Sequence, residues 1–171
     1  TNYYREFGGK LLAWGSRSPP LIVGEKLIIN PGASDASVAA LDRKTGSLIW
    51  KTSGHAAGYS AFVFGKLGGR RQIVGYDSAS LGGWDPATGK RLWQHVPTEG
   101  SDFNVTTPLI HDGHLLLATE NNPTRLHKFS ENGILVDKPT MVNLDLAPDT
   151  CSPIIVGDRG FATAYGCLLY T

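Results

Sequence analysis

The chain has 171 residues, enough to bury one sizeable core or to form part of a larger ring of repeats. Charged residues make up 18% of it and the formal net charge is +1, which excludes the basic face of a nucleic-acid-binding protein and the composition of an acidic, disordered tail. The 21 glycines and 10 prolines are a heavy load for helices and favour turn-rich β structure.

The printed N-terminus, Thr1 to Arg5, carries neither an initiator methionine nor the apolar segment of a signal peptide. No apolar run approaches the roughly 20 residues that a bilayer-spanning helix needs. We therefore predict no membrane span, and we expect the chain to be a stretch of something longer.

Residues 18–51 are predicted to form the first of several repeat units. Pro20 opens an apolar strand that ends at the turn Gly24–Glu25, and a second strand follows over 26–30. A third strand enters an Asp-x-x-Thr-Gly turn, and a fourth leaves that turn toward a tryptophan. The residues of this motif are Ala40, Asp42, Thr45, Gly46 and Trp50.

The motif recurs in a second unit over residues 59–95, which opens at Ala61 in place of Pro20. Its Asp, Thr, Gly and Trp each lie 43 positions after their counterparts, and Gly83 replaces the alanine. Four matching residue types at one offset indicate an internal repeat, and a period of about 40–45 residues with short strands is typical of propeller blades. The recurring residues are Asp85, Thr88, Gly89 and Trp93.

A basic, glycine-rich segment over residues 65–71 lies between two predicted strands of the second unit. It lacks the spacing of a phosphate-binding P-loop and the strand-loop-helix setting that gives such loops their anion site. We therefore expect a solvated hairpin tip.

The third unit, residues 105–138, keeps the motif turn but not the tryptophan. It opens at Pro108, turns at Asp112–Gly113 and retains Gly133 in the motif turn, while Asp137 stands where the tryptophan would fall. This unit is expected to have lost the side-chain signature of the repeat and to have kept its backbone path.

The histidines offer a metal-binding interpretation that we do not favour. His111 and His114 flank the predicted Asp-Gly turn, which places them on two successive strands, so we interpret them as exposed turn residues. His55, His95 and His127 have no partner that the sequence identifies and stay unassigned.

The fourth unit, residues 151–171, is incomplete: it opens at Pro153, turns at Gly157–Asp158 and lacks the motif turn. Cys151 and Cys167 lie 16 positions apart and have no zinc-like spacing. They either form a disulfide across neighbouring strands or remain two small buried side chains, and the sequence does not decide between these.

The physics of the motif explains its spacing. An aspartate at the first position of a type I turn accepts hydrogen bonds from the backbone two and three residues on, and the threonine adds a hydroxyl partner. The glycine supplies the positive φ of a bulge that returns the next strand in register. The tryptophan, four residues later, offers a large rigid face that can pack on the neighbouring blade.

At these residues the chain resembles the pyrroloquinoline quinone (PQQ)-like propeller repeat, Ala-x-Asp-x-x-Thr-Gly-x-x-x-Trp. The first copy meets this pattern in full, and the second departs only at Gly83. The resemblance implies the fold far more specifically than the function, because members similar to this chain include quinoprotein alcohol dehydrogenases, a lipoprotein of outer-membrane barrel assembly, and extracellular sensor domains.

We therefore predict an all-β fold, a single partial β-propeller over residues 1–171 with four-stranded antiparallel blades like those of WD40 proteins. The four units supply about three and a half blades. Because an open arc would expose apolar blade faces, we expect the ring to be completed by a homo-oligomer or by the remainder of a longer parent chain.

The resemblance also frames the cofactor question. Enzymatic members bind PQQ and calcium with carboxylate and amide side chains, often beneath a ring of adjacent cysteines. Here the two cysteines are not adjacent and no carboxylate matches the catalytic aspartate by a surrounding motif. We predict no catalytic residue, no metal ligand and no cofactor, and the alternative is a fragment of a quinoprotein dehydrogenase whose catalytic residues lie elsewhere.

Loops that lead into the innermost strands surround one mouth of a propeller channel. The residues in these loops that we predict as ligand contacts are Arg17, Tyr59, Asn104 and Asp149. The alternative is that they only satisfy backbone groups near the axis. The predicted function is therefore a non-catalytic module that binds or scaffolds a protein or polymer, but no nucleic acid, in a periplasmic or extracellular location.

Overall fold

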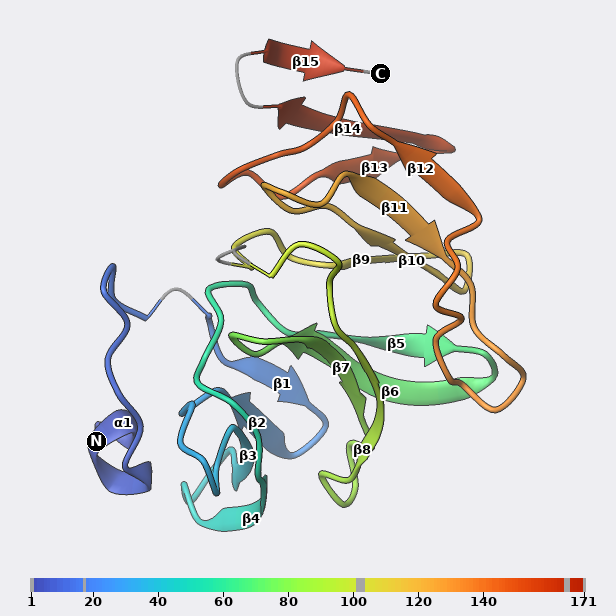
Figure 1. The fold of residues 1–171 in the computed structure, drawn as a ribbon. Helices are drawn as coiled ribbons and strands as arrows, with labels where there is room; N and C mark the ends of the chain where they lie inside the picture. The colour runs from blue at the N-terminus through green and yellow to red at the C-terminus, as the bar shows by residue number, and fades with distance from the viewer. Residues whose placement is uncertain (1, 17, 101–103, 165–166, 171) are drawn as a thin grey trace.

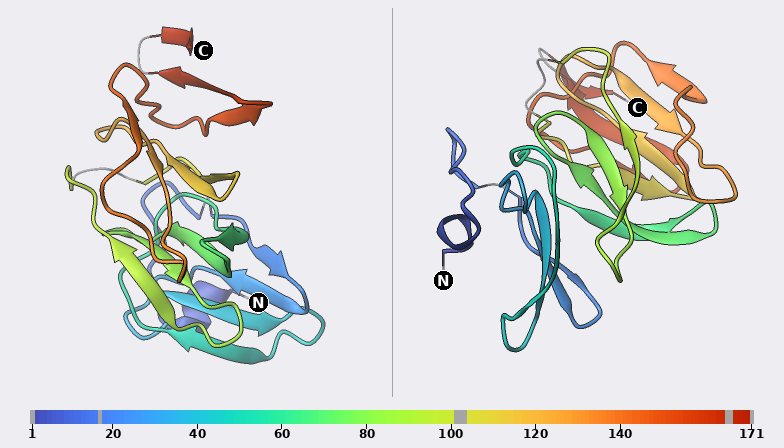
Figure 2. Two further views of the ribbon diagram at one scale, coloured as in Figure 1. Left: turned by 90° about the vertical axis from the view of Figure 1, so that its right-hand side faces the viewer. Right: turned by 60° about the horizontal axis from the view of Figure 1, so that its bottom comes forward.

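The protein is described by a computed structural model that covers residues 2–16, 18–100, 104–164 and 167–170. Its strands form four antiparallel sheets with the strands of each sheet in chain order. The sheets follow one another from β1–β4 to β13–β15 and are stacked face to face (Figures 1 and 2). This is the predicted all-β arc of about three and a half propeller blades.

The elements of each blade are as follows. A short helix, α1 (Tyr3–Phe7), precedes blade 1. Blade 1 comprises β1 (Leu21–Val23), β2 (Lys26–Ile29), β3 (Val38–Asp42) and β4 (Leu48–Thr52). Blade 2 comprises β5 (Val63–Leu67), β6 (Arg70–Tyr76), β7 (Leu81–Trp84) and β8 (Arg91–His95). Blade 3 comprises β9 (Leu109–His111), β10 (His114–Leu117), β11 (Thr124–His127) and β12 (Met141–Asn143). Blade 4 comprises β13 (Ile154–Val156), β14 (Arg159–Ala164) and β15 (Cys167–Tyr170).

The turn between β3 and β4 is held by Asp42. Its Oδ1 accepts hydrogen bonds from the backbone N–H groups of Lys44 and Thr45 at 2.9 and 2.8 Å and from the Thr45 hydroxyl at 3.0 Å. Hydrogen bonds from Thr45 and Lys44 hold the pKa of Asp42 below its ordinary value. Asp85 makes the same set of contacts between β7 and β8, so the motif closes the same turn in both blades.

Gly46 and Gly89 end these turns with φ values of +75° and +73°. The strand register shifts by one residue between Ala40 and Leu41, opposite β4, and between Gly83 and Trp84, opposite β8. Because side chains disfavour this left-handed region, the glycines allow the bulge that returns the outer strand to the sheet.

Blades 1 and 2 bury a shared core of side chains from both sheets. Trp50 of β4 is only 8% exposed and donates a hydrogen bond from Nε1 to the Pro86 carbonyl, in the motif turn of blade 2, at 3.2 Å. Phe62 and Trp84 meet edge to face at 5.6 Å. The tryptophan of the motif therefore packs on the turn of the next blade. The buried residues of this core are Ile28, Val38, Ala40, Trp50, Phe62, Ile73 and Trp84.

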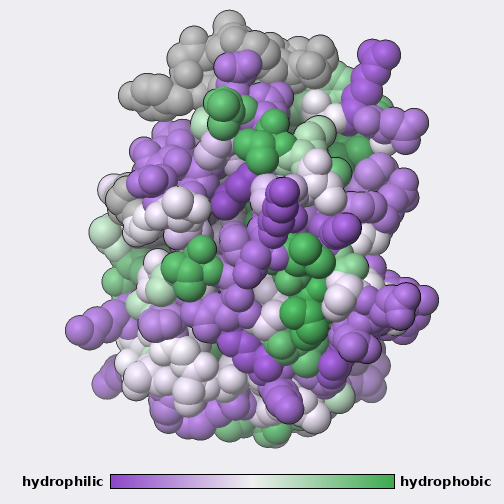
Figure 3. Space-filling model, turned by 45° about the vertical axis from the view of Figure 1, so that its right-hand side comes forward, coloured by the Kyte–Doolittle hydropathy of each residue, from purple (hydrophilic) through white to green (hydrophobic). Residues whose placement is uncertain are grey.

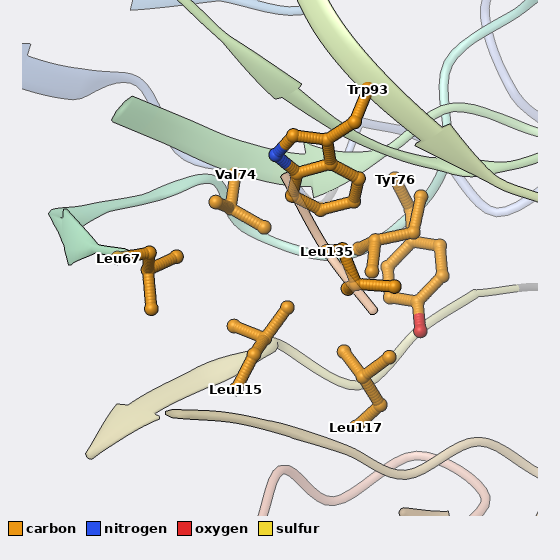
Figure 4. Packing of buried hydrophobic residues seen from close by; sticks show 8 residues of the cluster. Leu67, Val74, Tyr76, Trp93, Leu115, Leu117 and Leu135 are labelled. Carbon is orange, nitrogen blue, oxygen red and sulfur yellow. The ribbon is translucent and has the colours of Figure 1, made fainter. Parts of the chain in front are cut away.

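The core between blades 2 and 3 joins β5–β8 to β10 and to the segment after β11 (Figure 4). Trp93 is 7% exposed and contacts Phe129 edge to face at 5.6 Å. Its Nε1 donates to Gln72 Oε1, and Gln72 Nε2 donates to the Gly133 carbonyl, at 2.6 and 3.0 Å. The buried Gln72 side chain therefore links Trp93 to the turn of blade 3 through two hydrogen bonds.

The glycine-rich hairpin of blade 2 differs from the solvated tip expected over 65–71. Leu67 is fully buried, and a Cβ on Gly68 would lie 2.9 Å from the backbone nitrogen of Gly133. The hairpin therefore packs on the degenerate turn of blade 3, and its glycines permit the close approach.

A ladder of hydroxyl contacts joins the residues just before the inner strands. The Ala61 N–H donates to Thr107 Oγ1 at 3.3 Å, and the Thr107 N–H donates to Ser152 Oγ at 2.9 Å. Ala61, Thr107 and Ser152 are thus equivalent, which makes Phe62 rather than Ala61 the counterpart of the prolines. The expected alignment of the second unit was wrong by one residue.

Substitution of the two turn glycines should give unequal losses of stability. Nothing lies within 4 Å of a Cβ on Gly46, so Gly46→Ala should cost about 1 kcal/mol through backbone strain alone. A Cβ on Gly89 would lie 2.7 Å from Trp50 Cδ2, so Gly89→Ala should cost about 2–4 kcal/mol. Chemical denaturation measures both, and equal losses would contradict the packing of Trp50 on this turn.

Removal of the Trp50 ring should destabilise the chain far more than removal of its N–H group. Trp50→Ala should lower the free energy of unfolding by about 3–5 kcal/mol, because it opens the core between blades 1 and 2. Trp50→Phe keeps an aromatic ring and loses the hydrogen bond to Pro86, so it should cost clearly less. If thermal melts of the two variants coincide, the ring does not carry the contact.

Candidate binding site at the loop end of the blades

Successive connections in an antiparallel blade lie at alternate ends. We call the loop end the end that holds the linkers between blades and the β2–β3, β6–β7 and β10–β11 loops, and the turn end the opposite one. Most of the buried polar side chains lie at the loop end, whereas the Asp-x-x-Thr-Gly turns lie at the turn end. The buried polar residues of the loop end are Asn30, Ser37, Ser60, Asp77, Ser80, Asn104, Thr106, Thr119 and Asn122.

Asp77 is the buried charge of the loop end and is fully paired within blade 2. Its Oδ1 accepts hydrogen bonds from the N–H groups of Ala79 and Ser80 at 3.0 and 2.7 Å and from the Ser80 hydroxyl at 3.0 Å. Its Oδ2 lies 3.3 Å from an Arg91 nitrogen. Arg91 also stacks on Trp84, 5.0 Å from the ring centre.

Burial lowers the pKa of Arg91 and the charge of Asp77 opposes this shift. The glycine at position 82 leaves room for the guanidinium, because a Cβ there would lie 2.7 Å from an Arg91 nitrogen. Asp77 and Arg91 therefore compensate each other's charge within blade 2, and the pair holds the β6–β7 loop in place.

Asn104 connects two neighbouring linkers at the loop end. Its φ is +52°, a left-handed conformation that asparagine tolerates better than most residues. Its Nδ2 donates to the Asp77 carbonyl at 3.2 Å, and its own carbonyl accepts from the Ser60 N–H at 2.9 Å. The linkers before blades 2 and 3 are thereby joined across the β6–β7 loop.

The four predicted mouth residues are placed unequally. Tyr59 is buried, and its ring lies tilted on that of Trp14 with the centres 5.7 Å apart. Its neighbour Ser60 donates to the Asn104 carbonyl, so the two linkers adjoin. Asp149 is half-buried in the linker before blade 4. Arg17 lies outside the described residues. Ligand contact by any of the four stays a prediction.

Several buried polar atoms of the loop end have no hydrogen-bond partner among the residues that the structure describes. These atoms are Asn30 Oδ1 and Nδ2, Ser37 Oγ, Ser60 Oγ and Asn104 Oδ1. All are uncharged, and leaving such groups unpaired in the interior costs about 1–3 kcal/mol each. They suit hydrogen bonding to uncharged hydroxyl, amide or water partners, and they include no nucleophile paired with a base.

The described residues do not fit a calcium-dependent PQQ site. Calcium takes six to eight oxygen ligands, several of them carboxylates. Within the described ranges, no group of three or more histidine, cysteine, aspartate or glutamate side chains is arranged to hold a metal ion. The buried carboxylate of Asp77 is already taken by Arg91 and Ser80, and Cys151 is an exposed free thiol.

A histidine pair between blades 2 and 3 was not foreseen from the sequence. The rings of His95 and His127 meet edge to face at 5.2 Å. His127 Nδ1 lies 2.9 Å from the Val136 carbonyl, and His95 Nδ1 lies 3.3 Å from Asp137 Oδ1. The expectation that Asp137 stands where the tryptophan would fall was wrong, because Met141 pairs with Leu126 as Trp50 pairs with Ala40.

The fully buried His127 has its pKa lowered, chiefly by burial and further by the neighbouring His95 and Arg125. The side chain is therefore neutral in the folded protein over a wider pH range than in the unfolded chain.

Comparison with known proteins agrees with this fold. A family model described as outer membrane protein assembly factor BamB matches residues 15–136. The quinone-dependent 1-butanol dehydrogenase of Thauera butanivorans is 36% identical over 93 residues, covering 46% of this chain and 15% of the dehydrogenase.

Solved structures share the fold at low identity. BamB from Moraxella catarrhalis superimposes with a TM-score of 0.64 at 18% identity, covering 92% of this chain and 48% of that one. The computationally designed Ika4 protein superimposes with a TM-score of 0.58 at 14% identity, covering 94% of this chain and 93% of the design. This chain thus spans about half of the BamB chain and a small part of the dehydrogenase. Among the described residues, no helix is long and apolar enough to cross a membrane.

The buried histidine should make stability depend on pH. The pKa of His127 is lower in the folded protein than in the unfolded chain, so the unfolded chain binds a proton first as the pH falls below about 6.5. The contribution of His127 to stability is therefore fully present above that pH and declines below it. The contribution of His127 to this slope is at most about 1.4 kcal/mol per pH unit. His127→Gln should flatten the slope in denaturation curves, whereas His55→Gln, at an exposed site, should leave it unchanged. Identical slopes in both variants would contradict the assignment.

Proposed function

Because this chain belongs to the PQQ-like propeller repeat family, whose matching model is described as outer membrane protein assembly factor BamB, we propose that it is a non-catalytic binding module of the cell envelope. Its ligand is a protein or polymer bound at the loop end. Its place of action is the periplasm or the cell exterior. It needs neither PQQ nor calcium, and further blades from a second copy or from a longer chain complete its ring.

The uncharged, polar composition of the loop end carries this proposal. Asn30, Ser60 and Asn104 supply donors and acceptors without a reactive group. Because their unpaired atoms are buried, they suit hydrogen bonding to main-chain amides or hydroxyl groups of a ligand through bridging water. The only buried carboxylate at the loop end among the described residues, Asp77, is neutralised by Arg91 and is not poised as a base.

The opposite side of the blades gives no comparable signal. Figure 3 brings the side of the β5–β6 hairpin forward and shows hydrophobic side chains in separate patches among polar ones. Apolar side chains scattered in this way are ordinary on a protein surface.

The second candidate is a fragment of a quinoprotein dehydrogenase, in which these blades form walls and residues elsewhere carry the chemistry. The 36% identity to the Thauera butanivorans dehydrogenase favours it. Under this alternative the metal and cofactor ligands are supplied from outside the described residues.

Titration of the intact protein with PQQ and calcium separates the two candidates. A binding module should show no PQQ-dependent calorimetric signal and no dye-linked oxidation of 1-butanol. Saturable PQQ binding that requires calcium, with alcohol oxidation, would replace the proposed function by the second candidate.

Site-specific photo-crosslinking tests which end of the blades binds. A photoreactive amino acid is placed in producing cells at the exposed loop-end residues Ser34, Ser78 and Glu120, and at the exposed turn-end residues Lys44 and Lys90 as matched controls. We expect the loop-end positions to give one recurring adduct and the turn-end positions to give none. Adducts from the turn end alone, or equal adducts from both ends, would contradict the proposal.

A further inference from the structure

The β5–β6 hairpin of blade 2 is longer than the corresponding hairpins of the other blades. β5 and β6 form five residue pairs, whereas the β1–β2, β9–β10 and β13–β14 hairpins form three each. The hairpin accordingly projects beyond the β1–β2 hairpin in Figure 1. Its two extra pairs join Lys66 to Arg71 and Leu67 to Arg70. The added length is therefore specific to blade 2, and it brings three basic residues to the turn end.

One face of this extension holds it on blade 3. Leu67 is fully buried in the core that blades 2 and 3 share. Arg70 lies on the same face, where a Cβ on Gly133 of blade 3 would come within 2.8 Å of Arg70 Cβ. The Arg70 guanidinium pairs with Asp85 of its own blade, with Nη2 2.9 Å from Oδ2. Both residues of this face thus have a structural role.

The other face of the extension, toward blade 1, carries two like charges side by side. Lys66 and Arg71 are directly paired, and they share this face with Ile73, which belongs to the core between blades 1 and 2. Both side chains are exposed, and neither forms an ion pair with any described residue. Phe64, on the same face, is 38% exposed. Like charges directly opposite each other destabilise a sheet, so packing does not explain this pair.

Blade 1 contributes a further basic group on the facing side. Val23 packs on the core shared with blade 2, and Lys26, its partner in the β1–β2 hairpin, lies on the same face. Asp42 pairs with Lys26 in the next strand, but its Oδ1 is occupied by hydrogen bonds within its own turn. Lys26 forms no ion pair within the described part of the chain. The facing sides of blades 1 and 2 therefore hold three basic side chains without an acidic partner.

The turn end of blades 1 and 2 is strongly positive, although the whole chain has a net charge of only +1. Seven basic and three acidic residues lie there, in the segments 24–26, 42–46, 66–71 and 85–90. At the loop end of the same blades, Asp35 is paired with Lys51 and Asp77 with Arg91. The excess positive charge of these two blades therefore lies at the turn end.

We propose that the turn end of blades 1 and 2 docks on the surface of an anionic phospholipid membrane. Lys26, Lys66 and Arg71 contact lipid phosphates, and the Phe64 ring enters the headgroup region beside them. Long basic side chains that no hydrogen bond fixes can follow the many phosphates of a membrane, and an exposed aromatic ring among them suits the membrane interface. This second surface goes beyond the proposed function, and it leaves the loop end free for the protein or polymer.

Cosedimentation with lipid vesicles tests this docking. We expect the protein to bind vesicles of equal parts phosphatidylglycerol and phosphatidylcholine but not phosphatidylcholine alone, and we expect added salt to weaken binding by screening. Lys66→Gln combined with Arg71→Gln should weaken binding about 30-fold, because each basic residue near an anionic surface contributes a factor of about five. Thermal melting should stay unchanged or rise, since a like-charge pair is removed. Lys10→Gln with Lys51→Gln removes the same charge elsewhere and should weaken binding far less.

Three results would overturn the inference: equal binding to both kinds of vesicle, equal weakening by the control variant, or no vesicle binding by the parent. Soluble polyglutamate that binds the parent but not the hairpin variant, without vesicle binding, would assign this surface to an acidic protein and would overturn the inference as well. A bilayer gives no protein adduct at Lys44 or Lys90, so photo-crosslinking remains a separate test of the proposed function.

Discussion

The packing of each blade against the next is the constraint on which the fold depends. A four-stranded sheet has two faces, and here both shared cores draw side chains from two successive sheets. Among the described residues, neither of these cores lies within a single blade. The apolar side chains of a strand are therefore buried only when the neighbouring blade is present. The stability of each blade depends on its contacts with its neighbours, as in other repeat proteins.

Two motif tryptophans are linked to the turn of the next blade, but they use different residues to make this link. Trp50 contacts the Pro86 carbonyl directly, whereas Trp93 reaches the Gly133 carbonyl through Gln72. In blade 3 Met141 stands at the register of the tryptophan and is 50% exposed. The contact of His95 with Asp137 lies between blades 2 and 3, so it does not replace a tryptophan contact between blades 3 and 4.

The difference between contacts that are local in sequence and contacts between blades explains which features could be predicted from the sequence. The motif turns were predictable because the bonds of Asp42 and the positive φ of Gly46 involve residues a few positions apart. The histidine pair and the pairing of Asp77 with Arg91 depend on strand pairing and on blade stacking, which no local spacing reveals. Asn104 was selected only as a linker residue, and its junction with Ser60 needs two blades in place.

The loop end combines linkers that are held by hydrogen bonds with buried polar atoms that have no partner among the described residues. This arrangement requires that each blade stabilise the next. Hydrogen exchange of the parent chain and of Trp50→Ala, followed by mass spectrometry, tests this coupling directly. We predict faster exchange throughout β1–β4 and in the 85–89 turn, with β9–β12 still protected. Faster exchange confined to β4, or equal loss of protection in all blades, would contradict it.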